Sequence, residues 1–132
     1  MNTKYLMISS AIATGLGGLI ASFLPSEILT AMGENATAFT TLMVQIMGAL
    51  YLGFAAMNWM AKSVLIGGIY AKPLCMGNSL HFFVAAMGLV KFSINNPGSW
   101  YLWTVTILYS IFAILFARVL FTNPKKVMTK TL

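Results

Sequence analysis

The sequence predicts an all-α membrane protein, an antiparallel bundle of four membrane-spanning helices, and two observations carry this prediction. Of the 132 residues, 59% are hydrophobic and only 8% are charged, whereas about 25% of the residues of soluble proteins are charged. A spanning helix needs roughly 20 mainly apolar residues, and four such stretches occur, at about residues 5–24, 38–61, 74–94 and 100–121. Little of the chain is left over for a soluble domain.

The first stretch, about residues 5–24, contains small residues at four-residue spacing, at Ser10, Thr14, Gly18 and Ser22. This spacing lets helix backbones approach closely in a membrane. We expect it to serve packing within the chain rather than a dedicated homodimer contact.

A short helix in the membrane interface is predicted directly after the first stretch. Pro25 and Ser26 suit a helix start, Glu27 suits the positive end of a helix dipole, and Gly33 suits a C-terminal stop.

The second stretch, about residues 38–61, contains Gln45 on one face with Ala49, Leu52 and Ala56. A polar residue among small ones predicts the face that meets other helices. The loop that follows contains Gly67, Gly68 and Pro73, which indicate a turn and match no phosphate-binding motif.

The third stretch, about residues 74–94, is the most polar of the four. It contains the only cysteine, Cys75, and the only histidine, His81, together with Asn78 and Lys91. Polar groups within a membrane are costly and indicate function by default. A single cysteine excludes an intramolecular disulfide and a CxxC redox pair, and we expect Cys75 to be a small apolar residue in packing.

The fourth stretch, about residues 100–121, opens with Trp100, Tyr101 and Trp103. Such a group of aromatic residues is typical of a helix that enters the membrane at this level. The remaining residues, 122–132, form a basic tail, which is predicted to be cytoplasmic and attracted to anionic lipid.

The basic residues predict the orientation of the helices. Seven of the eight lie at the helix ends of one side: Lys4, Lys62, Lys72, Arg118, Lys125, Lys126 and Lys130. Because Lys and Arg concentrate in cytoplasmic loops, we expect both termini to be cytoplasmic, in a bacterial-type inner (cytoplasmic) membrane. Basic residues spread in this way form no nucleic-acid-binding patch, and the expected partners are membrane lipid and, as an alternative, another membrane protein or a second copy of the chain.

Polar residues at matching depth suggest two groups. Near the cytoplasmic side Asn58 is level with Asn78, and His81 lies about one turn deeper at 1.5 Å rise per residue. Near the outer side lie Gln45 and Lys91, under a loop that contains both acidic residues. Hydrogen bonding between helices is one interpretation of the inner group, and a ligand-binding site, with candidates Asn58, Asn78, His81 and Gln45, is the other. For Lys91 the alternatives are extension to the outer headgroups and an ion pair with Glu27 or Glu34.

No catalytic residue, metal site or cofactor site is predicted, because His81 has no carboxylate in its helix and Cys75 lies on another face of it. The expected function is therefore that of an accessory or scaffold protein, or of a bundle that binds lipid or a small apolar ligand. The alternative is a small transporter with a polar site at Asn58, Asn78 and His81. Because proton-coupled export uses a carboxylate within a helix, and both acidic residues lie in the outer loop, such a transporter requires another coupling scheme.

Three segments of the chain carry a resemblance to a known group of proteins. They are the ILTAMG turn after the first helix, the VQIMGALYLGFAA segment in the second, and KPLCMGNSLHFF at the start of the third. In this layout the chain resembles the DoxX-like group of small bacterial four-helix membrane proteins, and in outline it is similar to the four-helix scaffold of ergosterol synthesis. The resemblance implies an antiparallel four-helix bundle with an accessory role. Gln45 stands where several such families have an arginine, and no catalytic residue is implied.

Overall fold

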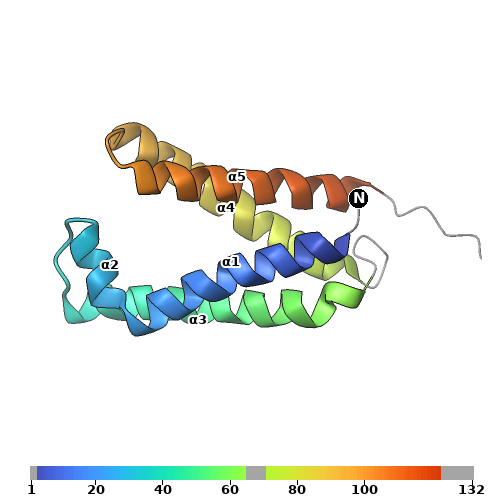
Figure 1. Ribbon diagram of the computed structural model, residues 1–132, viewed down its shortest axis with the longest axis horizontal. Coiled ribbons are helices and arrows are strands. Elements are labelled where there is room, and N and C mark those ends of the chain that lie inside the picture. The colour runs from blue at the N-terminus through green and yellow to red at the C-terminus, as the bar shows by residue number, and fades with distance from the viewer. Residues whose placement is uncertain (1–2, 65–70, 123–132) are drawn as a thin grey trace, which may run out of the picture. The chain divides into compact units, whose positions relative to one another are not determined.

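The computed structural model describes residues 3–64 and 71–122, which are helical apart from short connections (Figure 1). The elements are α1 (Thr3–Phe23), α2 (Pro25–Ala31), α3 (Ala38–Met60), the 3-10 turn η1 (Ala61–Ser63), α4 (Lys72–Asn95) and α5 (Trp100–Phe121). Four helices, α1, α3 with η1, α4 and α5, are long and apolar enough to cross a membrane. No strand occurs in these two ranges. The predicted all-α class and the four apolar helices are thus confirmed.

The observed ends of the long helices lie within two residues of the predicted ones. One element boundary differs in kind: α4 begins at Lys72, so Pro73 lies in its first turn and not in the preceding loop. Proline suits this position because the amide hydrogen that it lacks would have no partner within the helix. Gly67 and Gly68 of the predicted turn, and the predicted tail beyond Thr122, lie outside the described residues.

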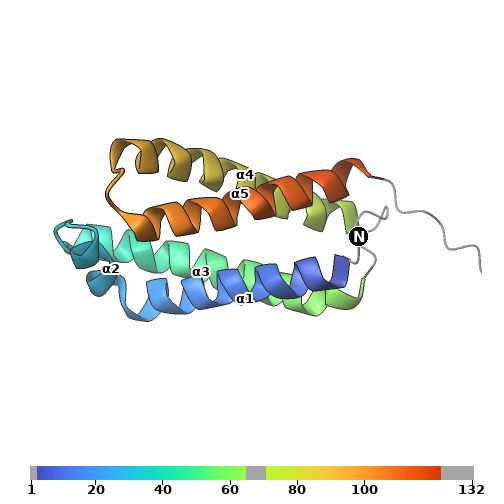
Figure 2. The same cartoon turned by 45° about the horizontal axis from the view of Figure 1, so that its top comes forward.

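The chain divides into two compact units, and each contains one helical hairpin. The first unit ends at Ser63 and holds α1, α2, α3 and η1; the second begins at Val64 and holds α4 and α5. In each unit the two long helices lie side by side and run in opposite directions (Figures 1 and 2). Each hairpin is therefore antiparallel, whereas the association of the two hairpins in one bundle stays a prediction.

Small residues bring α1 and α3 close together. A Cβ atom added at Gly18 would lie 2.9 Å from the backbone nitrogen of Leu52 and 3.0 Å from the carbonyl oxygen of Gly48. A Cβ atom added at Gly48 would lie 2.7 Å from the backbone nitrogen of Ser22. The predicted ladder of small residues in the first helix therefore packs against α3, as membrane helices with small residues at their contact do.

The connection between α1 and α3 contains the predicted short helix, α2. Gly33 follows it with φ +78°, in the left-handed region that glycine adopts without strain. A capping box then starts α3: the side chain of Thr37 accepts a hydrogen bond from Thr40 N at 3.1 Å, and that of Thr40 accepts one from Thr37 N at 2.9 Å. The short helix and its glycine stop are confirmed, and its position in the membrane interface stays a prediction.

Aromatic rings fill the contact between α4 and α5 near the middle of α4. Phe82, only 1% exposed, stacks on Phe116 with ring centroids 5.5 Å apart and also packs on Phe112 at 4.9 Å and Tyr109 at 5.3 Å. Cys75, nearer the start of α4, is buried, and its thiol donates to the carbonyl oxygen of Phe116 at 3.6 Å. Cys75 is therefore a packing residue, as predicted.

Candidate functional site

Asn58 links the two long helices of the first hairpin. It is completely buried, and its side-chain amide donates a hydrogen bond to the hydroxyl of Ser10 in α1 at 3.1 Å. Ser10 in turn donates to the carbonyl oxygen of Met7 at 3.0 Å. A buried polar group that bonds across to a neighbouring helix stabilises their packing, which agrees with the interpretation of Asn58 as a packing residue.

Gln45, the other candidate in this hairpin, is exposed. The face of α3 that meets the glycines of α1 contains Gly48, Tyr51, Leu52 and Ala55. At about 100° per residue, the centre of this face lies roughly a quarter of a turn from the centre of the predicted stripe of Gln45, Ala49, Leu52 and Ala56, and the two share Leu52. The predicted stripe therefore meets α1 in part: a Cβ atom added at Gly18 would lie 2.9 Å from Cγ of Leu52, and Ala56 lines a hollow with Ala11, whereas Gln45 is exposed.

Asn78 and His81 belong to α4, in the second hairpin. Asn78 is buried, and its side-chain amide donates to the carbonyl oxygen of Leu74 at 3.0 Å. The half-buried ring of His81 lies 5.0 Å from that of Phe82 and 6.0 Å from that of Tyr109, between centroids. The predicted group of Asn58 with Asn78 and His81 draws on both hairpins and stays a prediction, as does the outer group of Gln45 and Lys91.

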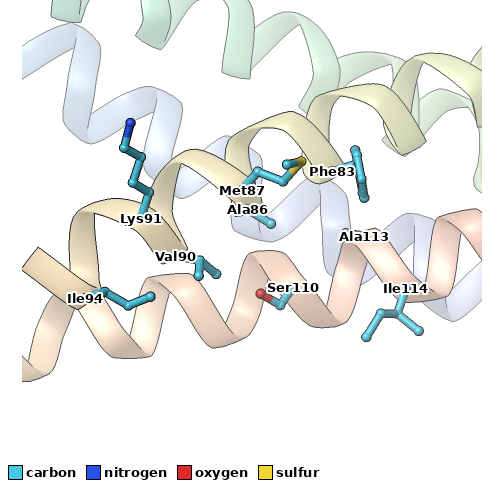
Figure 3. A pocket seen from close by; sticks show the side chains of 9 residues that line it. All are labelled: Phe83, Ala86, Met87, Val90, Lys91, Ile94, Ser110, Ala113 and Ile114. Atoms are coloured by element: carbon cyan, nitrogen blue, oxygen red, sulfur yellow. The ribbon is translucent and has the colours of Figure 1, made fainter.

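An apolar groove runs along the α4–α5 hairpin (Figure 3). Of the polar residues considered above, only Lys91 lines it. Its volume is about 490 Å³. The lining residues are Phe83, Ala86, Met87, Val90, Lys91 and Ile94 of α4, and Ser110, Ala113 and Ile114 of α5. A groove of this size lies within the usual range of ligand sites, about 300–1,000 Å³.

The groove forms where small side chains lie next to two contacts of α4 with α5. On one side of them is the layer of aromatic rings around Phe82. On the other side the hydroxyls of Ser93 and Thr106 share a hydrogen bond of 2.8 Å. Ala86 lies between these contacts on α4, and Ala113 lies beside Phe112 on α5; both side chains are buried and short, and they form the floor of the groove.

The groove has the length of one leaflet of a membrane. Phe83, at the middle of α4, and Ile94, next to its last residue, are eleven positions apart, which is about 16 Å at 1.5 Å per residue. Half of a hydrocarbon core of about 30 Å is about 15 Å. Trp100 and Trp103 are exposed at the start of α5, at the Ile94 end of the groove, and exposed aromatic residues of this kind are typical of the headgroup level.

One charge lies at this end of the groove. Lys91 is the only charged lining residue, and Figure 3 shows its ammonium group extended away from Ser110 and α5, whereas Val90 and Ile94 reach toward α5. The whole segment from Val64 to Leu132 contains no acidic residue, since both acids of the chain lie in the first unit. No carboxylate of its own hairpin can therefore neutralise Lys91.

The first hairpin offers a smaller hollow of about 280 Å³, lined by Ala11, Ile12, Ala55, Ala56 and Trp59. The ammonium group of Lys62 lies 3.5 Å from the centroid of the Trp59 ring, a cation–π contact. Within residues 3–64 and 71–122, no three His, Cys, Asp or Glu side chains form a group that could hold a metal ion.

Reasoning from unusual residues missed the groove because its floor consists of alanines, which are ordinary in a membrane helix. The spacing of Ala86 and Val90 on α4 is visible in the sequence. That Ala113 stands opposite them depends on the register of α4 against α5, which the Phe82 contacts and the bond between Ser93 and Thr106 set.

Comparison of the chain with family models, with curated proteins and with solved structures found no match. The resemblance to the DoxX-like group therefore stays a prediction. The geometry of the two hairpins is then the basis on which a function is assigned.

Proposed function

We propose that the protein is a multi-pass integral membrane protein that binds the acyl chain of a membrane lipid in the groove of the α4–α5 hairpin. The observation that carries this proposal is the apolar groove between Phe83 and Ile94, which has the length of one leaflet. The protein acts in this proposal as a lipid-binding accessory or scaffold protein and catalyses no reaction.

The lining of the groove suits an acyl chain. The side chains of Phe83, Met87, Ile94 and Ile114 are more than half exposed, so they present apolar surface to the hydrocarbon around the helices. Because lipid tails are as apolar as leucine, water supplies no drive for this contact. The affinity must come from dispersion contacts, at about 0.1–0.2 kcal/mol for each well-placed atom pair, and these favour a chain that fills the groove.

In the proposed arrangement the two hairpins pack into one antiparallel four-helix bundle with both termini in the cytoplasm. The excess of Lys and Arg at the helix ends of one side supports this orientation. Under it, the α4–α5 turn and the Ile94 end of the groove face the outer leaflet of an inner membrane.

Filling the groove tests the proposal. Val90 lines the groove and Val84, six residues earlier on α4, does not. Val90→Trp should weaken binding of a palmitoyl-oleoyl phospholipid about tenfold, because about ten displaced atom contacts correspond to about 1–2 kcal/mol. Val84→Trp, which adds the same bulk on an exposed face, should bind as the unchanged protein does.

Lipid binding is measured by native mass spectrometry of the full chain released from detergent micelles, over a titration of added phospholipid. Circular dichroism of both variants confirms that the helices are retained. Equal lipid binding by the Val90 and Val84 variants would show that the groove holds no acyl chain.

A further inference from the structure

We infer that the groove selects a phospholipid of net negative charge, whose headgroup phosphate is bound by Lys91. This inference rests on the proposed function, since it requires an acyl chain in the groove. It adds the chemical class of the lipid and the end of the groove at which its headgroup lies.

Charge complementarity is the first argument. Of the nine lining residues only Lys91 is charged, and the second unit contains no Asp or Glu that could pair with it. A net-anionic headgroup supplies a counter-charge that the α4–α5 hairpin itself lacks. A zwitterionic headgroup carries a cationic group of its own, so it neutralises Lys91 less well.

The depth of Lys91 is the second argument. It lies four residues before the end of α4, which is about 6 Å along the axis. A lysine side chain can bury its methylene stem and extend its ammonium group to the headgroup level. Exposed Trp100 and Trp103 at the start of α5 indicate that this level lies at the same end of the hairpin.

The helix dipole of α5 acts in the same direction. Its N-terminus, at Trp100, is at the end of the hairpin where the headgroup would lie, and its first turn contains no acidic residue. The positive end of a 22-residue helix favours an anion nearby. Because the ammonium group of Lys91 extends away from α5 (Figure 3), the dipole is a separate contribution, and it would not suffice without Lys91.

The order of chemistry along the groove matches that of a lipid molecule. From Lys91 the groove continues past Val90 and Met87 to Phe83, which is the middle of α4. A phosphate at Lys91 therefore places the acyl chain along apolar side chains and its end near the middle of the membrane. A phospholipid bound in the opposite direction would place its phosphate in the hydrocarbon core of the membrane, which is costly.

A competition experiment on the full chain tests the inference. Palmitoyl-oleoyl phosphatidylglycerol and palmitoyl-oleoyl phosphatidylcholine have the same acyl chains and differ in net charge, so native mass spectrometry with equal amounts of both measures the preference. We expect the unchanged protein to prefer the anionic lipid about fivefold. Lys91→Gln should remove this preference, and Lys91→Arg should retain it.

Lys72→Gln is the matched control, because Lys72 is exposed on the same helix at the opposite end and does not line the groove. It should leave the preference unchanged. Equal preference in the Lys91→Gln variant and the unchanged protein would overturn the inference, as would no preference in the unchanged protein or an equal loss in the Lys72→Gln variant.

The outcomes separate the inference from the proposed function. If Val90→Trp weakens binding of both lipids but Lys91→Gln changes no preference, the acyl-chain site stands and the anionic selectivity is wrong. If Val90→Trp binds both lipids as Val84→Trp does, the proposed function fails and the inference fails with it.

Discussion

Replacing Gly48 by alanine should destabilise the contact between α1 and α3. The added Cβ atom would lie 2.5 Å from the hydroxyl of Ser22, 2.7 Å from the backbone nitrogen of Ser22 and 3.0 Å from the carbonyl carbon of Ala21. The hydroxyl can rotate away, but the other two atoms belong to the backbone of α1. Relief of the overlap therefore requires α1 and α3 to move apart, which weakens the other contacts between them.

The expected cost is about 1–3 kcal/mol, the usual range for an overpacked helix contact. Gly53→Ala is the matched control on the same helix, because an added Cβ atom there would meet nothing within 4 Å. Both variants gain the helix propensity of alanine over glycine, up to about 1 kcal/mol. The difference between their free energies of unfolding therefore isolates the overlap at Gly48.

The measurement is reversible unfolding in mixed micelles, in which sodium dodecyl sulfate is titrated against a non-ionic detergent and helix content is followed by circular dichroism. Gly48→Ala should unfold at a lower dodecyl sulfate fraction than Gly53→Ala. Free energies of unfolding that agree within about 0.5 kcal/mol, the range of ordinary surface substitutions, would refute the close approach of α1 and α3.

Two more pairs of variants test the packing of the hairpins in the same assay. Asn58→Ala removes the hydrogen bond to Ser10 and should cost about 0.6–1.7 kcal/mol, whereas the exposed Gln45→Ala control should be nearly neutral; equal effects would contradict the packing role of Asn58. Phe82→Ala removes the centre of the aromatic layer and should lower the free energy of unfolding by about 3–5 kcal/mol. The control Phe83→Ala changes a neighbouring side chain that is 55% exposed and should cost far less. Similar losses in the two variants would contradict the arrangement of α4 against α5.

The helices could be predicted from the sequence because the features that determine them are local. The length and apolar composition of each stretch determine the four long helices, and Pro25 and Gly33 bound the short helix between α1 and α3. The ladder of small residues in α1 could be predicted as a packing face for the same reason, since its period follows from the helix itself.

The partners of polar residues could not be predicted, because they depend on how one helix is positioned against another. Asn58 and Ser10 are 48 residues apart in the chain and are brought together by the register of α1 against α3. The same register places Gly48 opposite Ser22 and leaves Gln45 exposed. Matching depth, on which the group of Asn58, Asn78 and His81 was based, says nothing about rotation around the helix axis.

The two hairpins differ in what lies between their helices, and this difference explains why polar residues are a poor guide to the candidate site. Between α1 and α3, glycines remove the space, so an added methyl group has no room at Gly48. Between α4 and α5, the ring of Phe82 packs on Phe112, and the small residues Ala86 and Ala113 beside it leave space unfilled. Hydroxyls in membrane helices bond to their own backbone, as Ser110 does to Thr106 at 2.7 Å, and need no ligand. An apolar ligand in a membrane instead requires a gap in packing, which arises where a large residue precedes small ones at a helix contact.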